Sequence, residues 1–477
     1  MQSIPGEDLA IDRKARMRIP VQEPNARPVE DRLRDFDATF VPLTEEEARE
    51  AASRCIHCPD PAPCATACPV NNDIPSAMWL IEQGDFIGAA EIYRRTSSMP
   101  EICGLVCPHE ALCEGSCVRS KREEPVQTGA LEAFATSYQR QHAGVEIEVG
   151  APTGKKVALI GAGPSSMGCA EVLIQKGHKV TFFEALPEPG GLLIYGIPNF
   201  KLTKDIVQAR VQDFVRAGAE VKTGVRVGQS VMIDELFATG YGAVFVGIGT
   251  GIDASMEAPG SDLPGVWKAT DFLVRTNVAP ELLPADKRES VDVGRKVVVI
   301  GGGDTASDCL RTALRLGAEQ VTCLYRRTEA EMPGGKKDRE LAKEEGAKYR
   351  FLTQPVRFLA GADGRLSGVE CLQCELGEPD ASGRRRPIPI EGSNFTVSAD
   401  TAIMALGYWP DPLVSKTTPD MQTDKWGQIQ ADRKTGATSK PGVFAGGDAV
   451  TGPDLVVTAM GSGRRAAEAI HQYLRST

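Results

Sequence analysis

Two patterns of apolar positions divide the chain near residue 150. Apolar residues recur at helical spacing between residues 74 and 95, and Gly84 interrupts the run, so two short helices are predicted there. Thr44 and Glu47 have the form of a capping box, which predicts a helix that begins at that point and ends near Cys55. After residue 150, short apolar runs alternate with helical stretches, the pattern of βαβ units around a parallel sheet.

A long-period repeat lies within this second part. The sequence KKVALIGAG at residues 155–163 recurs as RKVVVIGGG at residues 295–303, and a helix-like stretch and a second apolar run follow each copy. The period is too long for a solenoid and indicates two Rossmann-like nucleotide-binding domains. Residues 1–43 show no clear periodicity and are expected to form an extended arm.

Composition and charge narrow the functional classes. The chain has 477 residues, of which 42% are hydrophobic and 25% charged, as in a folded globular protein. Its net charge of -10 argues against a nucleic-acid partner. The N-terminus has no apolar core of a signal peptide and no run approaches about 20 apolar residues, so we expect a cytoplasmic protein without a membrane span.

Eight of the thirteen cysteines lie between residues 55 and 117. Their spacings and the two Cys-Pro pairs are typical of ferredoxin-like proteins with two [4Fe-4S] clusters, where a cysteine before proline often binds the other cluster. By that logic three cysteines bind the first cluster and four the second. The first set is Cys55, Cys58 and Cys64, and the second is Cys68, Cys107, Cys113 and Cys117.

These sets leave Cys103 as a spare thiol and the first cluster one ligand short. Structural zinc is the alternative, although only Cys55 and Cys58 form the C-x2-C knuckle that zinc sites use in pairs. His57 and His109 lie in the cysteine loops, where an ordinary polar role is favoured over ligation. The other cysteines lie in apolar segments and are expected to be buried and inert.

The first copy of the repeat has the form of a dinucleotide fingerprint. Gly161 and Gly163 permit a tight turn, and the helix that follows would hold a pyrophosphate at its N-terminus. Ser166 replaces the third glycine and is small enough for close packing. Glu184 ends the next apolar run, where a carboxylate accepts hydrogen bonds from an adenosine ribose, which suits FAD or NAD.

The second copy is GGGDTA at residues 301–306, and no acid ends its next apolar run. Arg326 and Arg327 stand there instead, and guanidinium groups pair with a 2′-phosphate, which predicts NADPH. The NADPH-binding residues predicted here are Gly301, Gly303, Asp304, Thr305, Arg326 and Arg327.

Several motifs together resemble one known family. They are GGLLIYGIPNFKL at residues 190–202, the Cys103-Gly104 and Cys113-Glu114 pairs, the GGGDTA motif and AGGD at residues 445–448. From about residue 30 onward the chain resembles the small (beta) subunit of NADPH-dependent glutamate synthase. It equally resembles the large subunit of NADH-dependent ferredoxin:NADP oxidoreductase and the electron-input half of dihydropyrimidine dehydrogenase.

The resemblance implies that the first fingerprint binds FAD, with Asp448 on the ribityl chain and the positive end of a helix near Gly461 facing the isoalloxazine. It also implies that Glu132 completes the first cluster, with Cys103 as a competitor. The implied FAD-binding residues are Gly161, Gly163, Pro164, Glu184, Gly191, Leu192, Gly447 and Asp448.

The implied fold is a helical iron–sulfur domain over residues 1–145 followed by two Rossmann-like domains. The FAD domain is split into residues 150–285 and 400–477, and the NADPH domain, residues 286–399, is inserted in it. No catalytic side chain is expected, because hydride transfer between cofactors needs no general acid or base.

The implied function is electron input: NADPH reduces FAD, and single electrons pass through two clusters to a partner subunit. The implied partner is the large subunit of glutamate synthase, which forms L-glutamate from glutamine and 2-oxoglutarate. The alternatives are a bifurcating ferredoxin-linked NADP oxidoreductase, a dihydropyrimidine dehydrogenase-type subunit, and a zinc scaffold with relic nucleotide folds.

Overall fold

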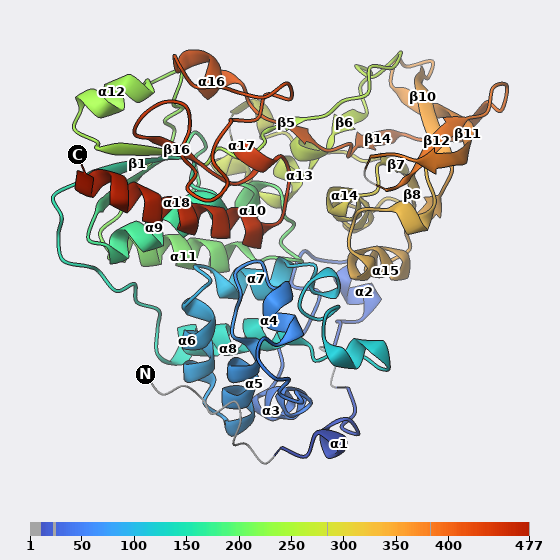
Figure 1. Ribbon diagram of the computed structural model, residues 1–477. Helices are drawn as coiled ribbons and strands as arrows, with labels where there is room; N and C mark the ends of the chain where they lie inside the picture. Colours follow the sequence, from blue (N-terminus) through green and yellow to red (C-terminus); the bar gives the residue numbers. More distant parts are fainter. Residues whose placement is uncertain (1–10, 22–24, 284, 382, 477) are drawn as a thin grey trace.

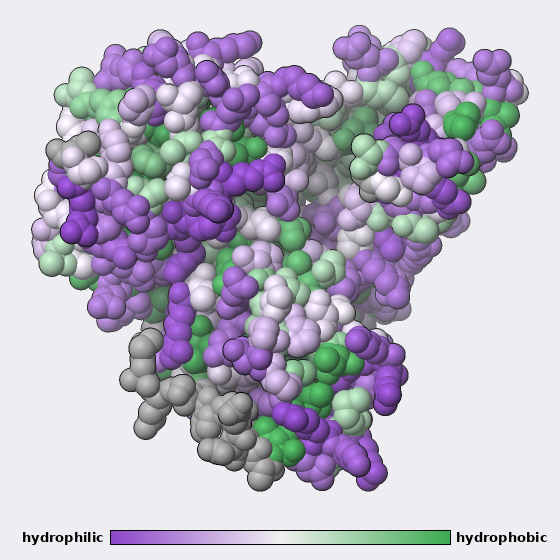
Figure 2. All heavy atoms as spheres, in the orientation of Figure 1, coloured by the Kyte–Doolittle hydropathy of each residue, from purple (hydrophilic) through white to green (hydrophobic). Residues whose placement is uncertain are grey.

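The computed structural model of the chain describes residues 11–21, 25–283, 285–381 and 383–476. Figure 1 shows a helical domain below two α/β lobes, and Figure 2 shows a largely hydrophilic face with a groove between the lobes. Within the described ranges, no helix combines the length and the apolar character needed to cross a membrane. Parts of the predicted arm, residues 1–10 and 22–24, lie outside these ranges.

The helical domain begins as its caps predict. The backbone N–H of Glu47 donates to the Thr44 hydroxyl (3.2 Å), and Glu47 Oε2 accepts from the Thr44 backbone N–H (2.8 Å), which starts α3. Gly84 has φ of +84° and ends α5, so the predicted pair of helices is confirmed. The helices are α3 Glu45–Ser53, α4 Pro63–Ala67, α5 Ile74–Gln83, α6 Phe86–Arg94, α7 Pro100–Val106, η1 His109–Ala111, η2 Val118–Lys121 and α8 Thr128–His142.

The described part of the arm is less extended than expected. It contains two four-residue helices, α1 Arg13–Arg16 and α2 Val29–Arg32. Asp12 stabilises α1, because its carboxylate accepts hydrogen bonds from the backbone N–H groups of Lys14 and Ala15, both at 3.0 Å. Such short, capped helices produce no apolar periodicity in the sequence, so the periodicity analysis did not predict α1 and α2.

The first nucleotide-binding domain is built on a parallel sheet of order β16-β4-β1-β2-β3. The helices α9 and α18 pack together, and glycines permit close contact: a Cβ at Gly168 would lie 2.3 Å from Met460 O, and one at Gly463 only 1.8 Å from Ser165 O. The elements are β1 Lys156–Ile160, α9 Pro164–Gln175, β2 Lys179–Phe183, α10 Leu192–Tyr195, α11 Lys204–Arg216, β3 Glu220–Lys222, α12 Ile233–Ala238, β4 Ala243–Val246, α16 Leu413–Thr417, β16 Val443–Ala445, α17 Asp448–Thr451 and α18 Val456–Ser476.

The second nucleotide-binding domain repeats this plan with a sheet of order β6-β14-β7-β8-β9. Its elements are β6 Val266–Lys268, α13 Ala269–Asn277, η3 Pro280–Leu282, η4 Ala285–Lys287, β7 Lys296–Ile300, α14 Asp304–Arg315, β8 Gln320–Leu324, η5 Glu329–Glu331, α15 Lys336–Glu344, β9 Lys348–Arg350 and β14 Thr401–Met404. An antiparallel sheet extends it, made of β10 Thr353–Ala360, β11 Leu366–Pro379, β12 Arg385–Pro389 and β13 Phe395–Ser398.

The domain boundaries differ from the predicted 286–399 insertion. Strand β14, predicted to reopen the FAD domain, pairs with β7 and β6 in the second domain, so residues 266–277 and 401–404 belong there. The chain crosses between the domains at a two-stranded ribbon of β5 Ile252–Asp253 and β15 Tyr408–Trp409. The sequence could not locate this crossing, because strand pairing and not apolar content distinguishes the two sheets.

A buried ionic cluster joins the arm to the second nucleotide-binding domain. The Glu345 carboxylate accepts hydrogen bonds from Arg311 (2.9 and 3.0 Å), Arg315 (2.7 and 3.1 Å) and Arg32 of α2 (3.2 Å). Burial raises the pKa of Glu345, but the hydrogen bonds and charges of Arg315 and Arg311 outweigh it and lower the pKa to about 2. The carboxylate is therefore ionised and compensated by three cations.

The first nucleotide-binding domain joins the same contact through Phe200. Its ring lies under Arg311 (4.5 Å) and Arg315 (4.0 Å), and its carbonyl accepts hydrogen bonds from the backbone N–H and hydroxyl of Thr39 (2.9 and 3.1 Å). Arg311 also donates to the Thr39 hydroxyl at 2.7 Å. This contact fixes how the arm and the two lobes are oriented relative to one another.

Replacing Glu345 tests this ionic cluster. We expect Glu345→Ala to lower the free energy of unfolding by about 3–5 kcal/mol, because it leaves buried guanidinium groups unpaired. The difference from the unsubstituted protein should shrink as pH falls from the ordinary pKa of 4.5 toward 2, since protonation then removes the same interaction. Urea unfolding at several pH values measures it. Glu344→Ala is the control, because the half-exposed Glu344 pairs with Arg32 (3.1 Å) at the edge of the cluster, and equal losses in both variants would contradict the assignment.

Candidate functional site

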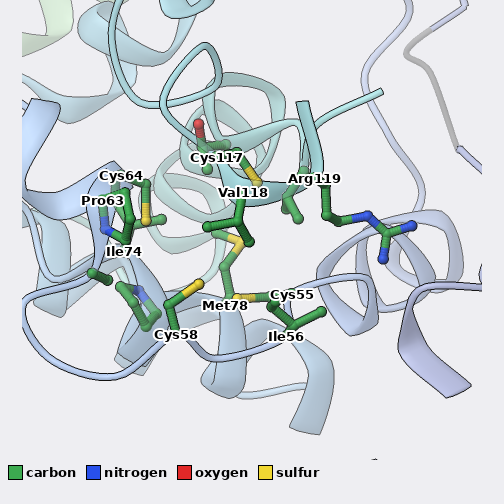
Figure 3. A pocket seen from close by; sticks show the side chains of 14 residues that line it. Cys55, Ile56, Cys58, Pro63, Cys64, Ile74, Met78, Cys117, Val118 and Arg119 are labelled. Carbon is green, nitrogen blue, oxygen red and sulfur yellow. The ribbon is translucent and has the colours of Figure 1, made fainter. Parts of the chain in front are cut away.

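Four cysteines surround one hollow in the helical domain, called here the first hollow. Cys55 follows α3, Cys58 lies in the next loop, Cys64 is in α4 and Cys117 precedes η2, and all four line a space of about 430 Å³ including its open mouth. Figure 3 shows side chains from these separate segments converging on the same space.

The first hollow fits an iron–sulfur cluster better than a single ion. Burial raises the pKa of Cys55 and Cys64 to about 12, so these thiols become thiolates only when metal compensates the charge. Among the described residues, no three Cys, His, Asp or Glu side chains converge as closely as one ion requires. Thiols spread around a hollow suit a larger group such as a [4Fe-4S] cluster.

Five further potential ligands line the second hollow, which has about 350 Å³ of space including its mouth. Its thiols come from the end of α4, from α7 and from the loop that follows α7. Glu132 enters it from α8, where the side chain is 7% exposed. The ligand candidates of the second hollow are Cys68, Cys103, Cys107, Cys113 and Glu132.

The residues that line the two hollows differ from the predicted ligand sets at two positions. Cys117, predicted with Cys107 and Cys113, lies in the first hollow, and Glu132, implied for the first cluster, lies in the second. Cys113 and Cys117 are four residues apart, but turns and not a helix connect them, so they share no face. Spacing alone cannot reveal this, because it does not fix the direction of side chains in irregular loops.

Glu132 is the buried group in the second hollow that most needs a partner. Burial, reinforced by nearby thiols and Glu101, raises its pKa well above the ordinary range. Among the described residues its carboxylate accepts one hydrogen bond, a long one from the Asn72 amide at 3.4 Å. Cys103 of α7, by contrast, accepts from the hydroxyl of Ser97, which precedes that helix (3.9 Å). Iron would compensate the carboxylate, which favours Glu132 as the fourth ligand.

The two histidines of the cysteine loops are partly buried and neutral. Burial lowers the pKa of His57 and of His109 to about 4. His57 packs edge-on against Trp79 and does not line the first hollow, whereas His109 does line the second. His109 packs against Gly129, where a Cβ would lie 2.3 Å from the imidazole ring.

The two hollows and the first nucleotide-binding domain are adjacent. Ile74 of α5 lines both hollows, so one apolar side chain separates them. Val457, in the first turn of α18, lines the second hollow together with its cysteines. Ser98, which precedes α7, donates its backbone N–H to Met460 Sδ at 3.5 Å. The second hollow therefore lies between the first hollow and α18.

The first fingerprint forms a cradle at the N-terminus of α9. Gly161 has φ of +84°, and among the described residues no atom lies within 4 Å of where a Cβ would stand at Gly163, so there is room for a phosphate. Ser166 of α9 fits because the residue that faces it, just after β4, is Gly247, where a Cβ would lie 2.4 Å from the Ser166 hydroxyl. Sequence reasoning missed Gly247, whose role depends on a tertiary contact.

Glu184 occupies the predicted ribose position after β2. Its carboxylate accepts hydrogen bonds from the backbone N–H groups of Ala162 and Leu186, both at 2.9 Å. Burial raises its pKa in spite of these bonds. Each oxygen keeps a lone pair that a ribose hydroxyl can reach.

The other residues implied for FAD gather around the same cradle. Gly191, at the start of α10 beside Leu192, has φ of +56°, and a Cβ there would lie 3.2 Å from Gly163 Cα. Gly447 donates its backbone N–H to the Ser462 hydroxyl of α18 (2.8 Å). Burial, reinforced by Asp454, raises the pKa of the adjacent Asp448 to about 7.

The second fingerprint has the same geometry at the N-terminus of α14. A Cβ at Gly301 would lie 2.1 Å from Ala405 O, whereas Gly303 faces open space among the described residues. Asp304 Oδ1 accepts from the Gly335 backbone N–H (2.8 Å), and the Thr305 hydroxyl lies 3.2 Å from Tyr408 OH. Tyr408 comes from the crossing ribbon and carries no motif that would have identified it.

The structure separates the two arginines predicted for the 2′-phosphate. Arg326 is exposed and has no hydrogen-bond or ion-pair partner in the described part of the chain. Arg327 is buried and donates to Arg385 O and Asp380 Oδ2, both at 2.7 Å, which anchors the β11–β12 hairpin. Arg326 is thus the available phosphate ligand, and Arg327 is already engaged.

Comparison with known families agrees with this architecture. Residues 32–144 match the family described as dihydropyrimidine dehydrogenase domain II, 4Fe-4S cluster. Residues 155–463, well over half of the chain, match the pyridine nucleotide-disulphide oxidoreductase family. The first match covers all the cysteines and Glu132 of the two hollows, and the second covers both fingerprints.

Individual proteins match nearly the whole chain. The small chain of NADPH-dependent glutamate synthase from Halomonas elongata is 42% identical over 465 residues, which cover 95% of this chain and 96% of that one. The Escherichia coli small chain is 40% identical over 464 residues, which cover 95% and 97%. Among solved structures, Mycobacterium tuberculosis FprA in complex with NADPH shares the fold, with a TM-score of 0.57 and 21% identity over 68% of this chain and 85% of that one.

Serine substitutions test the corrected ligand sets. We expect Cys117→Ser to perturb the same cluster as Cys55→Ser, and Cys113→Ser to perturb the same cluster as Glu132→Ala. Iron content and electron paramagnetic resonance (EPR) of the reduced protein distinguish the two clusters. Cys169→Ser, in the core of the first nucleotide-binding domain, is the control and should leave both signals intact. Matching spectra for Cys117→Ser and Cys113→Ser would restore the sets predicted from spacing.

Alanine substitutions test the separation of the two arginines. We expect Arg326→Ala to weaken NADPH binding by about 10- to 100-fold, the loss of one charge-assisted phosphate contact, with little effect on NADH. Arg327→Ala should reduce binding of both nucleotides together, because it loosens the hairpin. Calorimetric titration of each variant with each nucleotide measures this, and equal losses of NADPH and NADH in Arg326→Ala would refute the assignment.

Proposed function

We propose, for a chain that belongs to the family of the glutamate synthase small chains, that it is the electron-input subunit of such an enzyme. It is an NADPH-dependent oxidoreductase with an FAD/NAD(P)-type fold and a 4Fe-4S domain. In the proposed role it delivers electrons from NADPH to a larger partner that forms L-glutamate from glutamine and 2-oxoglutarate.

The observation that carries the proposal is the position of the second hollow. Val457 of α18 and the cysteines line it together, so it adjoins the helix whose Ser462 hydroxyl accepts the Gly447 backbone N–H at the FAD cradle. Ile74 then connects it to the first hollow. The order along this path is FAD cradle, second hollow, first hollow.

The chain's own residues would hold each group. Cys55, Cys58, Cys64 and Cys117 would bind one cluster in the first hollow, and Cys68, Cys107, Cys113 and Glu132 the other in the second. The N-terminus of α9 would hold the FAD pyrophosphate, and Glu184 its adenosine ribose. When bound, NADPH supplies a hydride, FAD converts it into single electrons and the clusters carry these one at a time.

Residues of the second nucleotide-binding domain would select and orient NADPH. Gly303 and Thr305 present backbone N–H groups at the N-terminus of α14, which suits the pyrophosphate. Arg326 would pair with the 2′-phosphate. No side chain is assigned as a general acid or base, because positioning is the protein's contribution to hydride transfer.

The partner would dock on the helical domain at the first hollow. Every residue that lines this hollow comes from that domain, between Cys55 and Thr128, whereas the second hollow also contains Val457. The first hollow is thus the end of the path that lies farther from the FAD cradle. An acceptor bound there would receive the electrons.

Anaerobic affinity purification of the tagged chain from its natural host tests the proposal. We expect a large companion with an amidotransferase domain, together with FAD and about eight iron atoms per chain, four for each cluster. NADPH should then support glutamate formation by the purified complex. Recovery of a small ferredoxin-reductase-like flavoprotein as the companion would favour the bifurcating alternative, and zinc without flavin would refute electron transfer altogether.

A further inference from the structure

The arm lies directly against the loop that carries the first two cysteines of the first hollow. Arg13 donates from Nε to Ile56 O (3.1 Å) and from Nη2 to His57 O (3.0 Å). Arg16 donates to Ser53 O (2.7 Å) and Cys55 O (3.1 Å). Two side chains of one helical turn thus bind the carbonyls of residues 53, 55, 56 and 57.

Arg16 is fixed in this position by a second interaction. Its guanidinium pairs with both oxygens of Glu82, at the end of α5, at 2.9 Å each. The two side chains are only 14% and 20% exposed, so solvent screens the pair weakly. The spacing of three residues places Arg13 and Arg16 on the same side of α1, whose first turn is capped by Asp12.

The loops of the first hollow bind the arm in return. Buried Arg119, whose stem lines the hollow, donates to Arg16 O (2.8 Å) and Ile19 O (3.3 Å). Its guanidinium points away from the hollow (Figure 3). Arg54, just before Cys55, donates to Ile19 O (3.3 Å). The contact is therefore reciprocal. Arginines of the arm donate to main-chain carbonyls of the cysteine loop, and arginines of the loops of the first hollow donate to main-chain carbonyls of the arm.

We infer that the arm segment, residues 11–21, is a clasp that positions the Cys55–Cys58 loop and raises the reduction potential of the cluster in the first hollow. The inference rests on the proposed function, since it presupposes that a cluster is held there. It assigns positioning roles to Arg13 and Arg16, which do not themselves bind iron.

The physical reason is the sign of the charge that reduction adds. The transfer in question moves one electron from the second hollow, whose cluster is oxidised, to the first, whose cluster is reduced, and no bond forms or breaks. The added negative charge is stabilised by the guanidinium groups of Arg13 and Arg16 next to the loop. Their hydrogen bonds also hold the backbone of the cysteine loop in place beside the hollow. Both effects favour electron flow from the FAD cradle outward.

The test is the Arg13→Ala/Arg16→Ala double variant of the full chain, loaded with FAD and iron under anaerobic conditions. A redox titration followed by EPR should show a lower midpoint potential for one cluster only, the one perturbed by Cys117→Ser. Iron should leave that cluster about tenfold faster in air, as expected for the loss of charge-assisted hydrogen bonds. An unchanged FAD content and an unchanged signal of the other cluster would show that the variant has folded.

Arg18→Ala is the matched control, because Arg18 lies on the same arm and its side chain has no hydrogen-bond or ion-pair partner among the described residues. Arg16→Gln, which removes the charge but keeps an amide donor, should lower the potential with less loss of iron. Selective loss of the first-hollow cluster in the double variant would support the clasp. Unchanged potentials and iron retention, or equal effects of Arg18→Ala, would overturn it. An unsubstituted protein without two clusters would instead refute the proposed function.

Discussion

The close contact between α9 and α18 is the constraint on which the rest of the structure depends. Gly168 and Gly463 permit it, since a Cβ at either position would collide with the main chain of the other helix. The contact brings the end of the chain back onto the first fingerprint and places Asp448 and Gly447 at the cradle. It also places Val457 against the second hollow. One helix pair thereby connects nucleotide binding to the cysteine sites.

Compensated burial of charge holds the lobes in place around this contact. Glu345 is fully enclosed by Arg32, Arg311 and Arg315, which come from the arm and from α14. Such clusters add less stability than an apolar core of the same volume, but each member strictly requires the others. They suit a protein whose domains must keep fixed distances, because electron transfer depends on the separation of its carriers. The arm contributes to two separate contacts: Arg32 binds Glu345, and Arg13 and Arg16 bind the loop beside the first hollow.

The cysteine sites show the difference between recognising a chemistry and assigning its ligands. Eight thiols in ferredoxin-like spacing identify the chemistry, because metal ligation needs those residue types close together. Cys117 and Glu132 line other hollows than their predicted sets imply, because turns and the packing of α8 set the directions of their side chains. The nucleotide sites show the same limit: Arg326 and Arg327 are adjacent in sequence, yet the β11–β12 hairpin engages only one of them.

The sequence by itself determined the domain types, the two fingerprints, the capped helix before Cys55 and the family, because these depend on local spacing and on residue type. The tertiary structure decided which strands share a sheet, which thiols share a hollow, what Gly247 and Tyr408 contact, and that the arm binds the backbone of the Cys55–Cys58 loop. These features depend on contacts between residues far apart in the chain. Apolar periodicity and motif spacing carry no information about such contacts, because they describe a segment's own shape and not its neighbours.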